Sequence, residues 1–168
     1  KVKLLGVVKA DGYGHGAVEI AKRLEQLGAG YLAVSNIDEC EELRDSGVTL
    51  PILMLGFTPA DQTARILQLH MTQAVQSYDI AKEFSDRAVA LGGKMIVHIK
   101  LDTGMRRLGF LEQDMEKLAE ILNSQQVIKA ETVFSHLSCA DVPSENDYTR
   151  MQFQIFDNCC EKLQSLLS

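Results

Sequence analysis

Short apolar segments alternate with longer amphipathic segments along the chain, and this order constrains the fold more than any other feature. Six apolar segments have the length of strands, at residues 3–9, 31–34, 52–55, 73–76, 94–101 and 131–137. Between them, apolar residues recur at steps of three and four, the period of a helix face. Strands that alternate with helices in this way predict an α/β fold with a parallel sheet and helical crossovers.

Several residues indicate where the helices begin and end. Ser77 is placed to cap one helix, and Thr58 followed by Pro59 predicts the start of another. Glycines follow three of the expected helices, at Gly28, Gly47 and Gly92. Apolar spacing predicts two further helices, over residues 115–122 and 148–167.

Six such units fit either a doubly wound open sheet or most of a (β/α)8 TIM-type barrel, and periodicity does not choose between them. The glycines after the first strand are Gly12, Gly14 and Gly16, which is not the G-x-G-x-x-G spacing of a dinucleotide site. The chain also lacks the G-x-x-x-x-G-K-[ST] loop that binds nucleotide triphosphates.

Length, charge and hydropathy exclude several classes of protein. A chain of 168 residues that is 46% hydrophobic predicts one domain over residues 1–168. Seventeen Lys and Arg against 23 Asp and Glu, with no basic run, argue against a nucleic-acid partner. No apolar stretch approaches the roughly 18 residues of a membrane span and no signal peptide is seen, so we expect a cytoplasmic protein with no membrane partner.

The four cysteines and the chain ends add two expectations. The spacing of Cys40, Cys139, Cys159 and Cys160 suits neither a disulfide framework nor a metal site, so we expect reduced thiols and no metal. The chain starts at a lysine close to its first strand and ends within its last helix, so we expect it to be part of a longer protein.

Ionisable residues lie at the carboxyl ends of three expected strands, where parallel α/β proteins carry their sites. Lys9 ends the first strand, Lys100 lies at the end of the fifth with Arg107 beyond it, and His136 ends the sixth. Alternation within each strand places these residues on one face with residues two and four positions earlier: Leu5 and Val7; Ile96 and His98; Thr132 and Phe134. If these faces share one interior, the side chains converge.

Lys9 can be interpreted in two ways from its position. A lysine at a strand end can reach into water and carry no chemistry. A lysine held among apolar walls instead has a lowered pKa, which frees the amine to attack an aldehyde.

Three segments decide between these interpretations: K-A-D-G-Y-G-H-G at residues 9–16, H-I-K-L-D-T-G-M-R-R-L-G at 98–109 and S-H-L-S-C-A-D at 135–141. Their order and content resemble the motifs of the alanine racemase family, which depends on pyridoxal 5'-phosphate. The resemblance implies that Lys9 forms the internal aldimine with this cofactor and acts as a base, with Tyr13 near the cofactor phosphate and His136 beside its ring. It implies that Arg107 is catalytic and helps to hold the substrate, and that Lys100 corresponds to a lysine that is often carbamylated.

The resemblance also implies an architecture and an activity. The fold would be the (β/α)8 barrel with six of its units present, and the activity would be an isomerase that interconverts L- and D-alanine for the cell wall, as a homodimer. None of the tyrosines, Tyr13, Tyr31, Tyr78 and Tyr148, lies in the family's second-base segment, which belongs to a C-terminal domain. We therefore expect this chain alone to be inactive.

Other functions stay open from the sequence. A serine or broad-specificity racemase, or a decarboxylase on a related barrel, would share the cofactor. A non-catalytic pyridoxal-phosphate carrier would lack the segment that contains Lys100 and Arg107, and a scaffold that binds nothing would take up no cofactor. Individually, His15 could bond backbone, and Asp102 with Thr103 could shape the turn after the fifth strand.

Overall fold

The computed structural model describes residues 2–124 and 127–167. Its strands are β1 (Leu5–Val7), β2 (Tyr31–Val34), β3 (Ile52–Met54), β4 (Met71–Val75), β5 (Met95–Lys100) and β6 (Ile128–Phe134). Its helices are α1 (Lys9–Gly14), α2 (Ala17–Gln26), α3 (Ile37–Asp45), α4 (Thr63–Gln68), α5 (Tyr78–Ala90), α6 (Met115–Ser124) and α7 (Asn146–Leu166). Short 3₁₀ turns are η1 (Ala60–Gln62), η2 (Glu112–Asp114) and η3 (Pro143–Glu145).

The six strands form one parallel sheet in the order β1-β2-β3-β4-β5-β6. Each strand pairs with the next strand in sequence, whereas a doubly wound sheet reverses its order at a switch point. The sheet is not closed, and β1 and β6 are its edges. The structure therefore confirms an α/β fold with six βα units of a barrel.

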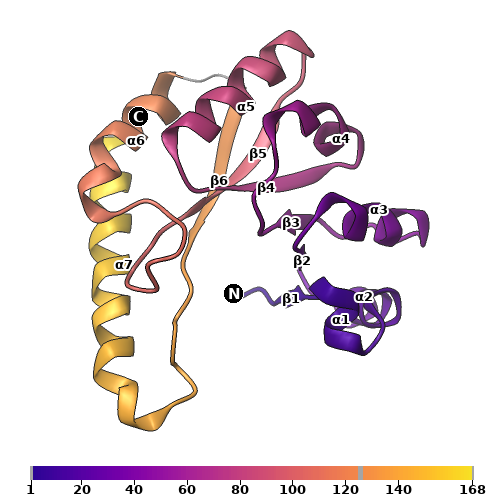
Figure 1. Ribbon diagram of the computed structural model, residues 1–168, viewed down its shortest axis with the longest axis horizontal. Helices are drawn as coiled ribbons and strands as arrows, with labels where there is room; N and C mark the ends of the chain where they lie inside the picture. Colours follow the sequence, from indigo (N-terminus) through magenta and orange to yellow (C-terminus); the bar gives the residue numbers. More distant parts are fainter. Residues whose placement is uncertain (1, 125–126, 168) are drawn as a thin grey trace.

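The two faces of the sheet have different surroundings. Helices lie around the outside of the strands (Figure 1). The face that packs on the helices is made of large buried residues, including Leu32, Ile52, Met54, Val97 and Ile99. The opposite face carries the small residues Ala33 and Ala74 together with Leu53, Tyr31, Leu55 and Phe134. This second face is the interior of the incomplete barrel.

The expected alternation is confirmed in β5 and β6. His98 pairs with Thr132 and Lys100 pairs with Phe134, after a register shift between Val97 and His98. His98 Nδ1 lies 2.6 Å from Thr132 Oγ1, so these two side chains point to the same side of the sheet.

Two strands end at least two residues earlier than the sequence predicts. β1 stops at Val7, and the last ladder hydrogen bond, from Val8 N–H to Ala33 O, is followed by a turn that starts at Lys9. β6 begins three residues before its expected start and ends at Phe134, so His136 lies in the following loop. Lys9 and His136 are therefore carried by turns and not by strands.

The predicted helix boundaries are mostly confirmed. Ser77 Oγ accepts a hydrogen bond from Ile80 N–H at the start of α5. Three glycines adopt positive φ just after helices: Gly28, Gly47 and Gly92. The expected cap at Thr58 is wrong, because Pro59 leads into the η1 turn without a side-chain cap and α4 follows that turn.

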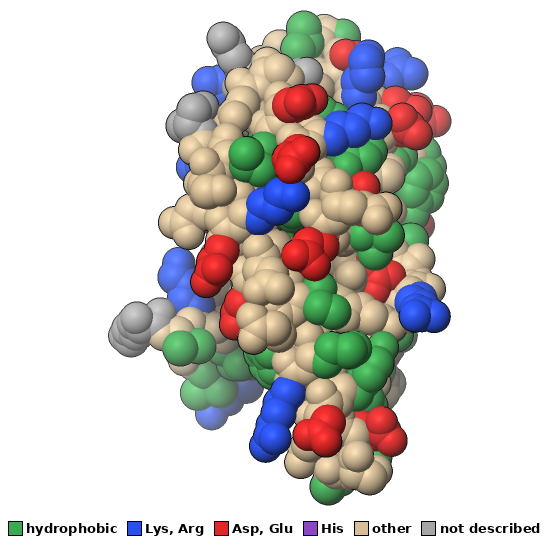
Figure 2. Space-filling model, turned by 90° about the vertical axis from the view of Figure 1, so that its left-hand side faces the viewer, with side chains coloured by type: hydrophobic (Ala, Val, Ile, Leu, Met, Phe, Trp, Pro, Cys, Tyr) green, Lys and Arg blue, Asp and Glu red, His purple; other side chains and the backbone are tan. Residues whose placement is uncertain are grey.

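The surface has no field of a single sign on the side where α7 lies. Acidic and basic side chains are interspersed there (Figure 2). Among the described residues, no helix is both long enough and apolar enough to cross a membrane.

All four cysteines are free, and Cys40 and Cys159 are buried.

Candidate active site

Lys9 begins a left-handed turn. The next four residues, Ala10, Asp11, Gly12 and Tyr13, have φ between 51° and 60°. Only Gly12 adopts this region without a steric cost, and a Cβ there would also meet Ile20 Cδ1 at 3.0 Å. This turn lies where alternation predicts the end of the first strand. Alternation of apolar and polar residues carries no signal for left-handed backbone, so it could not predict the turn.

The turn places Lys9 beside Tyr13. The Lys9 side chain is half-buried, and its Nζ lies 5.9 Å from the centroid of the Tyr13 ring. The Tyr13 side chain is 60% exposed. Asp11 closes the turn by accepting a hydrogen bond from Ala17 N–H at 2.8 Å, and His15 Nδ1 contacts the backbone oxygens of the turn as expected.

The loop after β5 folds back on the strand and presents Arg107. Asp102 Oδ1 accepts hydrogen bonds from Gly104 N–H at 2.9 Å and from Arg106 N–H at 3.0 Å. Gly109 returns the chain against the end of β5, where an added Cβ would lie 2.5 Å from Asp102 N. Asp102 therefore shapes the turn, as the sequence suggested, and Arg107 is exposed at its tip.

Lys100 points into the barrel interior. Its Nζ donates a hydrogen bond to Leu101 O at 2.9 Å and lies 5.3 Å from the Phe134 ring centroid. Burial lowers the pKa of Lys100 to about 8, Asp102 partly opposes this shift, and the charge of Arg107 lowers it further. Near neutral pH, this amine is therefore much closer to its uncharged form than an ordinary lysine is.

His136 connects the separate elements electrostatically. Burial lowers its pKa, and the positive charges of Lys100, Arg107 and Lys9 lower it further, in that order. Charges from the turn after β1, the end of β5 and the loop after β5 therefore act on one imidazole. The structure places the four ionisable residues that the motifs single out at or just beyond the carboxyl ends of β1, β5 and β6.

Gln152 is a site-supporting residue that the sequence analysis missed. It is fully buried on α7, where its Nε2 donates to Thr103 Oγ1 at 3.2 Å and to His136 O at 3.1 Å. Its Oε1 accepts from Ser138 N–H at 3.0 Å. Gln152 thus ties the loop after β5 to the loop after β6. A polar residue in register with the buried Cys159 and Leu163 of the same helix was the available signal.

A second polar group lies inside the barrel. Tyr31 OH of β2 donates to Glu131 Oε2 of β6 at 2.8 Å, and the Tyr31 ring meets the His98 ring edge-on at 5.3 Å. Burial and the hydrogen bond to Glu131 raise the pKa of Tyr31 to about 12. Burial lowers the pKa of His98, and Glu131 opposes that shift. The hydrogen bond between Tyr31 and Glu131 therefore connects β2 to β6 across the interior.

A groove of about 700 Å³ lies along the loop after β5, and of Lys9, Lys100, Arg107 and His136 only Arg107 lines it. Its lining includes Arg107, Asp102, Gln76, Phe57 and Leu108. The groove therefore opens at the carboxyl ends of the strands, where α/β barrels carry their sites.

The chemistry of Lys9, Lys100, Arg107 and His136 fits pyridoxal phosphate. The cofactor has an aldehyde, for which an amine such as that of Lys9 is the natural partner, and an anionic phosphate and ring oxygen, which cations stabilise. Lys9, Lys100 and Arg107 lie at or just beyond the carboxyl ends of β1 and β5, and after burial their positive charges lower the pKa of His136, so the residues present fit an anionic group.

Comparisons with known proteins identify relatives along the whole chain. The family model for the alanine racemase N-terminal domain matches residues 1–168. "Alanine racemase 2" of Caldanaerobacter subterraneus subsp. tengcongensis is 38% identical over 165 residues, which is 98% of this chain and 42% of that protein. The solved alanine racemase of Clostridium difficile 630 superimposes with a TM-score of 0.92 at 40% identity, over 98% of this chain and 43% of that one.

A racemase of different name has the same fold. The histidine racemase of Leuconostoc mesenteroides superimposes with a TM-score of 0.85 at 25% identity, over 92% of this chain and 42% of that one. In all of these matches the chain spans less than half the length of the relative.

Proposed function

This chain belongs to the alanine racemase family, and we propose that it supplies the cofactor-binding barrel of an amino-acid racemase that interconverts L- and D-alanine. Residues 1–168 form the part of the N-terminal barrel domain that carries Lys9, Lys100, Arg107 and His136. The observation that carries the proposal is that Lys9, Lys100, Arg107 and His136 all lie at or just beyond the carboxyl ends of β1, β5 and β6, where the three cations act on His136. The relatives named alanine racemase support the proposal that alanine is the substrate.

Pyridoxal phosphate, when bound, supplies the electron sink for the removal of a substrate α-proton. Lys9 is the residue that would hold it covalently, and the same amine then serves as a base on one face of the substrate. Tyr13, on the same turn, would be the residue near the cofactor phosphate, and His136 would be the residue beside its ring. The cationic surroundings favour His136 in its neutral form, which suits stacking on a ring.

Arg107 is the residue proposed to orient the substrate. A guanidinium binds a carboxylate through two parallel hydrogen bonds, which fixes the orientation of an amino acid. Lys100 lies beneath this loop with a pKa of about 8. An amine that is partly neutral at physiological pH can take up carbon dioxide, so we propose carbamylation of Lys100 as the modification that would replace a repelling cation by an anion beside Arg107.

We propose that the base for the opposite face is none of Tyr31, Tyr78 and Tyr148. Tyr31 OH donates to Glu131, Tyr78 OH to Asp114 O and Tyr148 OH to Gly104 O, all as structural hydrogen bonds. We therefore propose that another part of the protein supplies this base within a cytoplasmic homodimer, and that the 168-residue chain alone does not racemise alanine.

The second candidate is a racemase with a different or broader amino-acid range. The histidine racemase relative favours it, because a similar barrel serves a different substrate there. Racemisation assays of the whole protein with alanine, serine and histidine separate these two activities.

The first test is reductive trapping. The chain is incubated with pyridoxal phosphate, reduced with borohydride and mapped by peptide mass spectrometry. We expect the pyridoxyl label on the Lys9 peptide, and its loss in Lys9→Ala but not in Lys22→Ala, which removes a lysine from the outer helix α2.

The outcomes separate binding from catalysis. Label spread over many lysines and unchanged in Lys9→Ala would overturn the cofactor role of Lys9. Racemisation of alanine by the isolated chain, at a rate near that of a complete alanine racemase, would overturn the assignment of the second base to another part of the protein.

A further inference from the structure

The left-handed turn that carries Lys9 needs contacts to hold it. Ala10, Asp11 and Tyr13 adopt left-handed backbone without being glycine. Each such residue costs roughly 1–2 kcal/mol relative to right-handed backbone. The turn therefore persists only where surrounding groups fix it.

Most hydrogen bonds that fix the turn lie after its first residue. Gly12 N–H donates to Val8 O at 2.9 Å and Gly16 N–H donates to Asp11 O at 3.0 Å. The Asp11 carboxylate binds Ala17 N–H. These bonds hold the middle and the exit of the turn. They leave the peptide between Lys9 and Ala10 to another group.

Glu39 of α3 holds this peptide. Its Oε1 accepts a hydrogen bond from Ala10 N–H at 2.9 Å, across 29 positions of sequence. Its Oε2 accepts from Ser35 N–H at 2.7 Å, and the Ser35 hydroxyl lies 3.0 Å from both oxygens. Burial by itself would raise the pKa of Glu39, but the hydrogen bonds from Ser35 and Ala10 outweigh it and lower the pKa. Glu39 is therefore a carboxylate at neutral pH.

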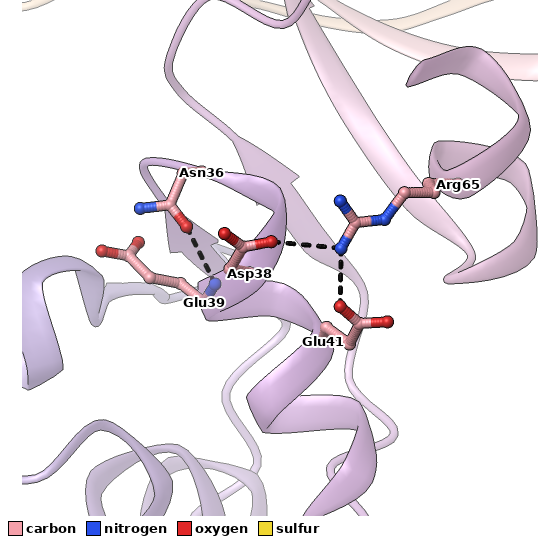
Figure 3. Close-up of polar contacts among 5 residues, drawn as sticks. All are labelled: Asn36, Asp38, Glu39, Glu41 and Arg65. Atoms are coloured by element: carbon pink, nitrogen blue, oxygen red, sulfur yellow. Dashed lines mark hydrogen bonds and ion pairs between the residues drawn. The ribbon is translucent and has the colours of Figure 1, made fainter.

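The neighbouring acidic residues have a different role. Asn36 Oδ1 accepts from Glu39 N–H at 2.9 Å and caps α3, while Asp38 and Glu41 both bind Arg65 (Figure 3). The Glu39 carboxylate points away from Arg65 (Figure 3). A glutamate three residues after an N-cap ordinarily returns to the N-cap N–H of its own helix. Here one oxygen also reaches the turn after β1, in a different βα unit.

We infer that Glu39 is a positioning residue for Lys9. It fixes the peptide that follows Lys9 against the turn after β2, and so sets the direction in which the lysine amine enters the site. The cofactor part of this inference rests on the proposed function. The structural part, that Glu39 holds the turn, does not.

The test compares Glu39→Ala and Glu39→Gln with Glu41→Gln, a control on the same helix whose carboxylate binds Arg65. Hydrogen–deuterium exchange of residues 9–16 reports the turn without any cofactor. The rate at which pyridoxal phosphate labels Lys9 under borohydride reports the position of the amine. We expect Glu39→Ala to speed exchange and to slow labelling, each by about tenfold, as loss of a hydrogen bond to a charged group implies.

Rescue separates positioning from general damage. Glu39→Gln retains an amide oxygen as an acceptor, so we expect intermediate exchange and labelling, while Glu41→Gln matches the native chain. If Glu39→Ala does not fold, the test is the comparison of Glu39→Gln with Glu41→Gln. Exchange and labelling in both Glu39 variants equal to those of Glu41→Gln would overturn the inference.

The two proposals fail in different ways. If native protein takes no label at Lys9, the cofactor proposal is wrong, and exchange alone decides whether Glu39 holds the turn. If Lys9 is labelled and the Glu39 variants change neither exchange nor labelling, the cofactor proposal stands and the role of Glu39 is wrong.

Discussion

Three cations act on one imidazole at the rim of this barrel, and that arrangement can be measured directly. Lys100 is the largest of the charge effects that lower the pKa of His136. Replacing it, in Lys100→Met, is expected to raise the pKa of His136 toward 6.5, because a repelling positive charge is removed. NMR titration of the histidine ring signals measures this shift.

The matched control for that titration is Lys82→Met. Lys82 is an exposed lysine of α5 whose Nζ binds Asp86. The Lys82→Met substitution removes the same charge far from the rim, so the midpoint of the His136 titration should stay at the native value. Equal midpoints in Lys100→Met and Lys82→Met would show that no positive charge at Lys100 acts on His136.

Lys100 also makes stability depend on pH in an unusual direction. Its folded pKa, about 8, lies below the unfolded value of 10.5. Between these values the folded protein binds fewer protons than the unfolded chain, so this lysine makes the free energy of unfolding rise with pH. Below pH 8 the ammonium is buried at a cost, and that cost disappears as pH approaches 10.5.

Lys100→Met is therefore expected to stabilise the protein most at pH 7, with a smaller gain at pH 9.5. Urea unfolding of the native chain and the variant at both pH values measures the two differences. Lys82→Met corrects for the general effect of losing a positive charge. A gain that stays constant or grows with pH would contradict the lowered pKa.

At the level of elements, the loop after β5 depends on Gly109. Its φ is 132°, and an added Cβ would lie 2.5 Å from Asp102 N and 2.6 Å from Leu101 C. These are backbone atoms that cannot move aside as a flexible side chain can. Gly109→Ala is expected to lower the free energy of unfolding by roughly 2–5 kcal/mol, from backbone strain and overlap together.

Gly47→Ala separates the two contributions in the same urea experiment. Gly47 also has a positive φ, 85°, but nothing lies within 4 Å of an added Cβ. Its cost should be only about 1–2 kcal/mol, the conformational part. If the two substitutions cost the same, Gly109 does not pack against the end of β5 as described.

These elements also show how far sequence reasoning reaches. Periodicity predicted six strands and a parallel sheet but not the order of the strands, because alternation and helix spacing are local properties of the sequence. It placed Lys9 and His136 on strands, which is wrong, because the chain leaves the sheet at Val8 and Phe134. The contacts of Glu39 and Gln152 join residues that are distant in sequence, so only the fold could reveal them.

The motif residues were predictable for a different reason. Lys100, Arg107 and His136 were singled out by segments that resemble a known family, and their convergence is visible in the electrostatics of His136. The resemblance carried no information about what holds them in place. That support comes from buried polar groups such as Gln152, whose helical register indicates burial but does not identify its hydrogen-bond partners.

For the molecule as a whole, the open sheet is the dominant feature. β1 and β6 are edges, and unpaired edge strands bind other strands. β1 and the residues before it also expose apolar side chains: Val2, Leu4, Leu5 and Val7. A chain of these 168 residues is therefore expected to self-associate as its concentration rises.

Charge on the β1 edge should weaken this association, because edge lysines oppose strand pairing between molecules. Leu4 precedes β1 and is 60% exposed, whereas Leu27 ends α2 and is 65% exposed. Sedimentation velocity of Leu4→Lys and Leu27→Lys over a range of concentrations compares an edge charge with an equally exposed charge elsewhere. We expect only Leu4→Lys to shift the distribution toward monomer. Equal shifts would assign the association to net charge, and a native chain that stays monomeric throughout would contradict the role of the open edges.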